Sequence, residues 1–138
     1  MATHNNSIFR EIGAKKFIPG IAWFFLILIA VCIPGYDLPK ADRWIITINY
    51  DKLIHVGLFA VLATLFMHPI SKSALSKKEK WQYFIKITIA TAIWGLTSEL
   101  IQKFFIPSRS FDLTDFLADA IGGVIALFFC KKYFLKGA

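Results

Sequence analysis

The sequence predicts an all-α membrane protein with four transmembrane helices and both termini in the cytoplasm. Three features of the 138-residue chain support this fold class. First, 57% of the residues are hydrophobic, which is more than small soluble domains usually have. Second, the chain contains four apolar stretches, each close to the roughly 20 residues that a helix needs to cross a bilayer. Third, the lysine and arginine residues gather in alternate connections between these stretches.

The apolar stretches are expected to form a single membrane domain over residues 1–138. Its predicted spans lie at about 17–34, 52–69, 82–106 and 113–130. The first span is uncharged over 18 residues, which corresponds to about 27 Å of helix. A basic flank followed by an apolar stretch is also typical of a signal peptide cleaved before Cys32. Because Val31 is bulkier than such cleavage sites accept, we favour a retained helix.

The connections between the spans are polar or contain helix breakers. Residues 35–50 combine Pro and Gly with basic and aromatic residues, including Arg43 and Trp44, and this mixture suits a segment that lies at the lipid headgroups. A serine- and lysine-rich turn at 71–80 separates the second and third spans. Pro107, followed by Ser108, is expected to end the third span.

The basic residues predict the orientation of the spans. Eleven of the 16 lysine and arginine residues lie at the N-terminus, in and beside the 71–80 turn, or at the C-terminus. The positive-inside rule therefore places both termini in the cytoplasm. The net charge of +7 is explained by this orientation and by anionic lipid headgroups. We expect no nucleic-acid partner, because no basic region with interleaved aromatic residues stands apart from the apolar stretches.

Polar residues that lie inside the predicted spans indicate a functional site. A charged group at the centre of a membrane helix costs roughly 2.5–3.5 kcal/mol on insertion scales, so such groups need a partner, a proton or a water-lined cavity. Three groups of polar residues, at the start of the second span, near the end of the third and at the start of the fourth, fall in the outer third of the bilayer, and we expect them to share one outward-facing cavity. The candidate ligand-binding residues are Asp51, Lys52, His55, Glu99, Gln102, Arg109, Asp112, Asp115 and Asp119.

Two further expectations concern the fourth span. Ala118, Gly122 and Ala126 follow one another at four-residue spacing, with Gly123 beside them, and small residues so spaced allow another helix to approach closely. Asp119 is the deepest carboxyl group of this span. We expect it to carry a proton and therefore to form hydrogen bonds much as an asparagine does.

The spaced polar motifs also resemble a known family. They are Asp51-Lys52-x-x-His55, Glu99-x-x-Gln102, Pro107-Ser108-Arg109, Asp112, Asp115 and Gly122. With these motifs the sequence resembles the VanZ-like family of small bacterial integral membrane proteins, from about Asp51 to Gly123. One position differs, since the family usually has asparagine where this chain has Asp119. The resemblance implies a multi-pass protein of the bacterial cytoplasmic membrane with a role in the cell envelope, because the named member of the family is associated with low-level resistance to the glycopeptide teicoplanin.

The function that we favour from the sequence is binding rather than catalysis. The outer cavity would bind an anionic envelope component, which could be a lipid headgroup, a cell-wall precursor or a glycopeptide. Lys52 and Arg109 would hold its phosphate or carboxylate groups. Three carboxylates, Asp51, Asp112 and Asp115, would orient these cations, and Trp44 and Tyr50 would offer a stacking surface. Beyond the lipid bilayer, the expected partners are this component and a second copy of the chain.

Two other function classes remain open. A membrane-embedded enzyme that acts on a lipid-linked headgroup could use His55 as general acid or base, oriented by Asp51, with Glu99 or Asp119 as a second titrating group. Against this reading, the sequence places no serine or cysteine beside His55. A proton-coupled carrier could use the buried carboxylates as a relay, although four spans would make a small carrier unless the chain forms oligomers.

A metal site and a purely structural network are the remaining interpretations of the polar residues. One histidine among several carboxylates could bind magnesium, calcium or manganese in preference to zinc. The absence of a paired histidine or cysteine argues against it, so the sequence predicts neither a metal site nor a cofactor. The same residues could instead form salt bridges and hydrogen bonds that join the last three spans.

Overall fold

The computed structural model describes residues 12–34 and 50–136, and these residues form helices without any strand. The elements are η1 (Ala14–Phe17), α2 (Ile18–Val31), α4 (Tyr50–Ser71), α5 (Lys77–Phe105) and α6 (Leu113–Phe134). Four helical segments, with η1 and α2 taken together, are long and apolar enough to cross a membrane. The predicted all-α class with four spans is therefore confirmed. The orientation of the termini stays a prediction, and the expected headgroup segment with Arg43 and Trp44 lies outside the described residues.

The helix boundaries differ from the predicted spans because caps, and not only apolar residues, decide where a helix begins. The first segment starts at Ala14 with a 3-10 turn and ends at Val31. The third helix starts at Lys77, five residues earlier than expected, because Ser76 forms a capping box. In this box the Ser76 hydroxyl accepts a hydrogen bond from the Glu79 amide at 3.3 Å, and the Glu79 carboxylate accepts one from the Ser76 amide at 2.9 Å.

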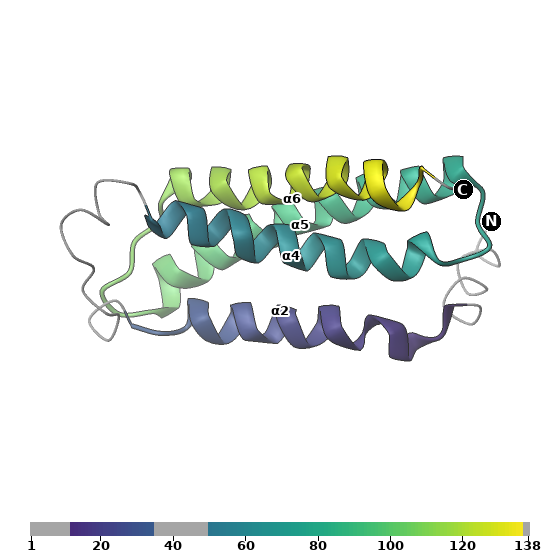
Figure 1. The fold of residues 1–138 in the computed structure, drawn as a ribbon. Coiled ribbons are helices and arrows are strands. Elements are labelled where there is room, and N and C mark those ends of the chain that lie inside the picture. Colours follow the sequence, from purple (N-terminus) through teal and green to yellow (C-terminus); the bar gives the residue numbers. More distant parts are fainter. Residues whose placement is uncertain (1–11, 35–49, 137–138) are drawn as a thin grey trace.

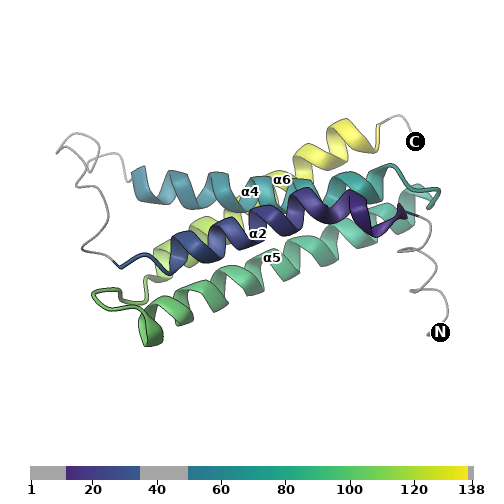
Figure 2. The same cartoon turned by 90° about the horizontal axis from the view of Figure 1, so that it is seen from below.

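Consecutive helices of the bundle run in opposite directions, and α6 packs most extensively against α4, which runs in the same direction as α6 (Figure 1). Helix α5 packs against both of them, while α2 lies against α4 and α5 on the side away from α6 (Figures 1 and 2). The starts of α4 and α6 lie at the same end of the bundle as the C-terminal ends of α2 and α5 (Figure 1). We call this the polar end, because the candidate site residues of α4, α5 and α6 lie toward it.

Two glycines allow α6 to approach its neighbours. A Cβ atom at Gly122 would overlap the carbonyl oxygen of Val56 and lie 3.0 Å from the amide nitrogen of Ala60. The backbones of α4 and α6 are thus in direct contact, which confirms the predicted close packing at this glycine. On the other side, a Cβ atom at Gly95 of α5 would lie 2.7 Å from the Cβ of Asp119. Glycine at these positions brings the polar side chains of three helices together.

The outward surfaces of the helices carry large apolar side chains. Several large apolar side chains of α2, α5 and α6 are between 52% and 68% exposed, among them Ile29, Ile93, Ile121 and Phe128. In water such a surface would promote association, whereas in a bilayer it contacts lipid. The distribution agrees with helices that face lipid on one side and one another on the other.

Candidate functional site

The structure brings most of the predicted site residues together at the polar end. Asp51, Lys52 and His55 lie in the first turns of α4, Glu99 lies near the end of α5, and Asp115 and Asp119 lie in the first two turns of α6. Because α4 and α6 both start at this end and α5 ends there, residues far apart in sequence reach the same depth. Two groups result, one around Lys52 and one around His55.

Lys52 is surrounded by three carboxylates. Its Nζ lies 2.6 Å from Asp115 Oδ1 and 3.4 Å from both Asp51 Oδ2 and Asp112 Oδ2. The side chain of Asp115 is 17% exposed, whereas those of Asp51 and Asp112 are 63% and 46% exposed. The ammonium group therefore joins α4 to α6. Its positive charge is already balanced by the carboxylates of the protein itself.

Asp112, in the loop between α5 and α6, forms hydrogen bonds with both of these helices. It is the N-cap residue of α6, and its Oδ1 accepts hydrogen bonds from the amide of Thr114 at 2.8 Å and from the Thr114 hydroxyl at 2.6 Å. The hydroxyl and amide hydrogen bonds from Thr114 hold the pKa of the Asp112 carboxyl below its usual value. The Asp112 amide donates in turn to Glu99 Oε2 at 3.1 Å. The capping role was missed in the sequence, although an aspartate directly before a helical apolar pattern is its usual signal.

His55 makes its hydrogen bond to a different carboxylate from the one expected. Nδ1 of His55 lies 2.8 Å from Asp119 Oδ1, and Nε2 lies 3.8 Å from Asp115 Oδ2. The spacing of residues 51 and 55 suggested that Asp51 would orient the ring, but the side chain of Asp51 contacts Lys52 instead. The imidazole is thus positioned by two carboxylates of α6, and its side chain remains 20% exposed.

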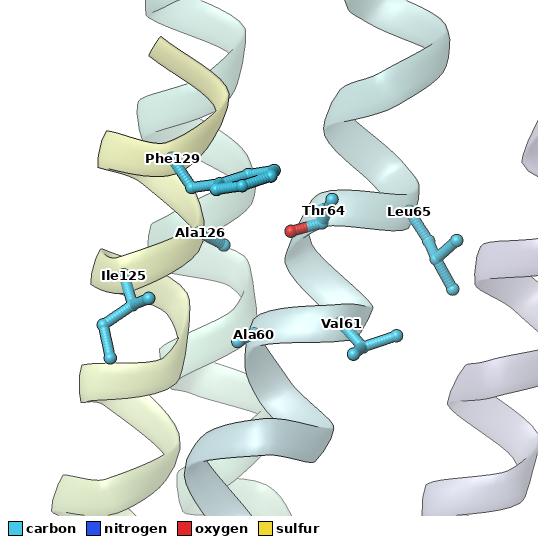
Figure 3. Close-up of a pocket in the computed structure, with 7 residues that line it drawn as sticks. All are labelled: Ala60, Val61, Thr64, Leu65, Ile125, Ala126 and Phe129. Atoms are coloured by element: carbon cyan, nitrogen blue, oxygen red, sulfur yellow. The ribbon is translucent and has the colours of Figure 1, made fainter. Parts of the chain in front are cut away.

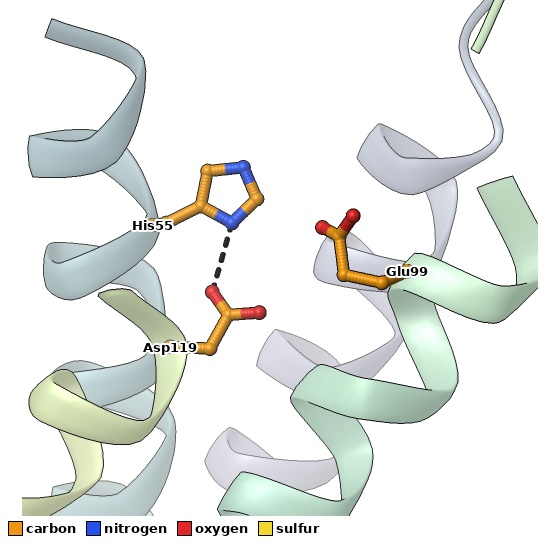
Figure 4. A group of neighbouring side chains, drawn as sticks. All are labelled: His55, Glu99 and Asp119. Atoms are coloured by element: carbon orange, nitrogen blue, oxygen red, sulfur yellow. Dashed lines mark hydrogen bonds and ion pairs between the residues drawn. The ribbon is translucent and has the colours of Figure 1, made fainter. Parts of the chain in front are cut away.

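Glu99 and Asp119 are both buried next to this ring. Their exposed fractions are 1% and 0%. Among the described residues, Glu99 Oε1 and Asp119 Oδ2 have no hydrogen-bond partner. One ligand atom from each of His55, Glu99 and Asp119 lies within 4.8 Å of the others, and Figure 4 shows the three side chains pointing toward a common space between α4, α5 and α6. These residues could hold a metal ion.

Gln102 and Arg109 contact α2 rather than the carboxylates. The Gln102 amide donates to the carbonyl of Val31 at 3.5 Å, and Nε of Arg109 donates to the carbonyl of Ile33 at 3.4 Å. These two carbonyl groups lie at and just beyond the end of α2, where helix carbonyls lack partners within the helix. Sequence reasoning did not find this role of the first span, because a backbone carbonyl leaves no sequence signal.

The profile of the VanZ/LLP1 family matches residues 8–136. The chain belongs to the VanZ/LLP1 family. The match extends beyond the motifs between Asp51 and Gly123, on which the resemblance depended. No curated protein and no solved structure matches the chain. Family membership and four helices of spanning length together indicate a multi-pass VanZ-like membrane protein.

A separate hollow of this VanZ/LLP1 protein lies between α4 and α6, away from the polar residues. Figure 3 shows its lining, and its volume is about 290 Å³. Thr64 supplies the only polar side chain of this lining, and Val61, Ile125 and Phe129 are exposed large apolar residues. Such a largely apolar surface suits contact with lipid chains.

Proposed function

We propose that this VanZ/LLP1 protein binds an anionic component of the bacterial cell envelope at the polar end of the bundle, which faces outward in the bacterial cytoplasmic membrane. The supporting observation is the convergence of charged side chains from α4, α6 and the loop before α6 at one end. Binding of this kind would account for the envelope role and the link to glycopeptide resistance that the family resemblance implies.

The charges of the polar end favour Arg109 as the anchor for the anionic group. The ammonium of Lys52 already faces three carboxylates, so a phosphate would have to displace one of them. Arg109 uses its Nε for the carbonyl of Ile33, and its terminal nitrogens can form two parallel hydrogen bonds to one phosphate or carboxylate. Arg109 therefore carries the recognition of the anion in this proposal.

The exposed carboxylates indicate what else the ligand should contain. Asp51 and Asp112 are about half exposed or more and can accept hydrogen bonds from hydroxyl or ammonium groups. A ligand that combines an anionic group with such donors fits better than a bare anion, because the carboxylates would repel the latter. Lipid headgroups and lipid-linked cell-wall precursors both have this composition.

The proposal is tested by lipid retention. Purified protein in detergent is mixed with phosphatidylglycerol or phosphatidylcholine, and bound lipid is counted by native mass spectrometry. Arg109→Lys should lower phosphatidylglycerol retention several-fold while leaving phosphatidylcholine unchanged, because an ammonium cannot reproduce the guanidinium fork. Lys103→Gln is the matched control, since it removes a cation at the same end whose Nζ lies over the Phe104 ring. Equal retention by Arg109→Lys and wild type would contradict the proposal, as would a loss of thermal stability that parallels the loss of binding.

A second candidate function rests on the His55–Asp119 contact. An imidazole held 2.8 Å from a buried carboxylate has the arrangement of a general base positioned by an acid. No serine or cysteine hydroxyl or thiol is in contact with this ring among the described hydrogen bonds, so such an enzyme would have to activate water. Turnover of a lipid-linked headgroup by the purified protein, lost in His55→Gln, would favour this function over binding alone.

A further inference from the structure

We infer that His55, Glu99 and Asp119 bind a divalent first-row transition-metal ion, such as Mn²⁺ or Zn²⁺. The three residues come from α4, α5 and α6, and one ligand atom of each lies within 4.8 Å of the others. Two ligands of a tetrahedral ion are about 3.4 Å apart when each bond is about 2.1 Å long. Side-chain rotations that draw these atoms together by about 1 Å would therefore bring all three to one ion.

The buried oxygens without partners are the second observation that points to a ligand. Glu99 Oε1 and Asp119 Oδ2 are buried and accept no hydrogen bond from the described residues, and their side chains point into the space that His55 also faces (Figure 4). Buried carboxylates are normally paired or coordinate metals. A divalent cation would give both oxygens a partner and would offset both negative charges.

The surroundings of the three ligands resemble the outer shell of a metal site. A metal-binding histidine usually directs its second nitrogen toward a carboxylate, and ligating carboxylates accept hydrogen bonds of their own. Here Asp115 Oδ2 lies 3.8 Å from His55 Nε2, on the side opposite Nδ1. The other oxygen of Glu99 accepts the hydrogen bond from the Asp112 amide at 3.1 Å, which fixes the orientation of its carboxylate.

The types of ligand determine the class of ion. One imidazole nitrogen and two carboxylate oxygens form a mixed set, whereas magnesium and calcium prefer oxygen ligands alone. Three protein ligands leave coordination positions for water or for an oxygen of a bound molecule. His55 is partly exposed at the polar end, so an ion can enter from the outer side without crossing the bundle.

Metal retention by the purified, tag-free full-length chain tests this inference. The protein is treated with chelator, supplied with Mn²⁺ or Zn²⁺, passed through a desalting column and assayed for metal by mass spectrometry, with affinity measured by calorimetry. The wild type should retain one ion per chain. His55→Gln, Glu99→Gln and Asp119→Asn should each lower the affinity by at least about tenfold, a loss that changes in outer-shell partners already produce.

Two substitutions serve as controls, and two outcomes would overturn the inference. Asp51→Asn removes an exposed carboxylate of the same end, and His68→Gln removes a histidine that packs on Phe134 instead; both should retain the ion. In chelator, Asp119→Asn should unfold at the same temperature as the wild type, since an amide oxygen can still accept from His55 Nδ1–H. Two outcomes would show that the cluster is only a hydrogen-bond network. Either the folded wild type retains no ion, or all three ligand variants retain as much metal as the wild type does. This assay contains no envelope ligand, so neither outcome tests the proposed role of Arg109 in binding an anion.

Discussion

The Lys52 ammonium lies 2.6 Å from the Asp115 carboxylate, 63 positions later in the chain, and this ion pair joins the start of α4 to the first turn of α6. Exposed ion pairs contribute about 0–1 kcal/mol, whereas breaking a buried pair costs about 3–5 kcal/mol. This pair is partly buried, with exposed fractions of 28% for Lys52 and 17% for Asp115. Its energetic contribution should fall between those limits.

Lys52→Met is therefore expected to lower the free energy of unfolding by about 1–2 kcal/mol. The change leaves Asp115 without its closest cation and brings three carboxylates together without a positive charge among them. SDS-induced unfolding followed by circular dichroism measures the effect. Lys103→Met, at the same end, should change stability by less than about 0.5 kcal/mol. If both variants lost the same stability, the three-carboxylate arrangement around Lys52 would have no special structural role.

Gly122→Ala should destabilise the bundle by about 1–3 kcal/mol or more. The added methyl group would overlap the backbone carbonyl of Val56, and backbone cannot move aside as a flexible side chain can. Gly123→Ala is the matched control, because its Cβ would lie 3.6 Å from methyl groups of Thr88 and Thr91, which is ordinary contact. That control should be neutral or slightly stabilising, since alanine favours helix by up to about 1 kcal/mol over glycine. Equal melting temperatures for the two variants would contradict the α4–α6 backbone contact.

The N-cap of α6 should make stability depend on pH in the acid range. The pKa of Asp112 is lowered in the folded protein, so its ionised form is stabilised by folding. This contribution is fully present above the unfolded pKa of about 3.9 and is lost as the pH falls through the lower folded pKa. The melting temperature of the wild type should exceed that of Asp112→Asn at pH 6, and the difference should disappear as the pH falls toward about 2.

The hydrogen bonds of the N-cap are tested separately from the charge of Asp112 by a variant that removes the acceptor altogether. Asp112→Ala removes the acceptor for Thr114 and should cost about 1 kcal/mol, as at other N-caps. The asparagine variant keeps an acceptor at the same place. A difference between wild type and Asp112→Asn that stayed constant from pH 6 to the acid limit would mean that the charge of Asp112 contributes nothing to folding.

The orientation of the bundle is tested by cysteine labelling. Cys32 and Cys130 are first replaced, because both are free thiols, and single cysteines are then introduced at Ser76 and Ser110. These positions lie at opposite ends of the bundle, before α5 and before α6 respectively. An impermeant thiol reagent should label the cysteine at 110 in intact cells and leave that at 76 unlabelled. Labelling at 76 would place the polar end in the cytoplasm and would contradict the proposed envelope ligand.

The number of helices and the depth of the polar residues could be predicted from sequence. The thickness of the bilayer sets the length of an apolar helix, so the apolar stretches predicted four spans, and residues 12–34 and 50–136 form four helical segments of sufficient length. Helical rise is constant, so the positions of His55, Glu99 and Asp119 within their spans also predicted that they would reach a similar depth. The small residue Gly122 indicated a close helix contact before the partner helix was known.

Which side chains contact one another was decided only by the tertiary structure. Depth along a helix does not determine how the helix is rotated about its axis or which neighbour it faces, and these depend on packing among several helices at once. His55 meets Asp119 instead of Asp51 because the contact of α6 with α4 at Gly122 brings Asp119 against the imidazole. In the same way, Lys52 is surrounded by carboxylates because the starts of α4 and α6 lie side by side, and Arg109 reaches the carbonyl of Ile33 because α2 and α5 end at the same end of the bundle. Sequence alone thus determined the number of spans and the end at which the polar groups lie. Packing between helices determined which side chains pair, and it left two carboxylate oxygens facing a common space.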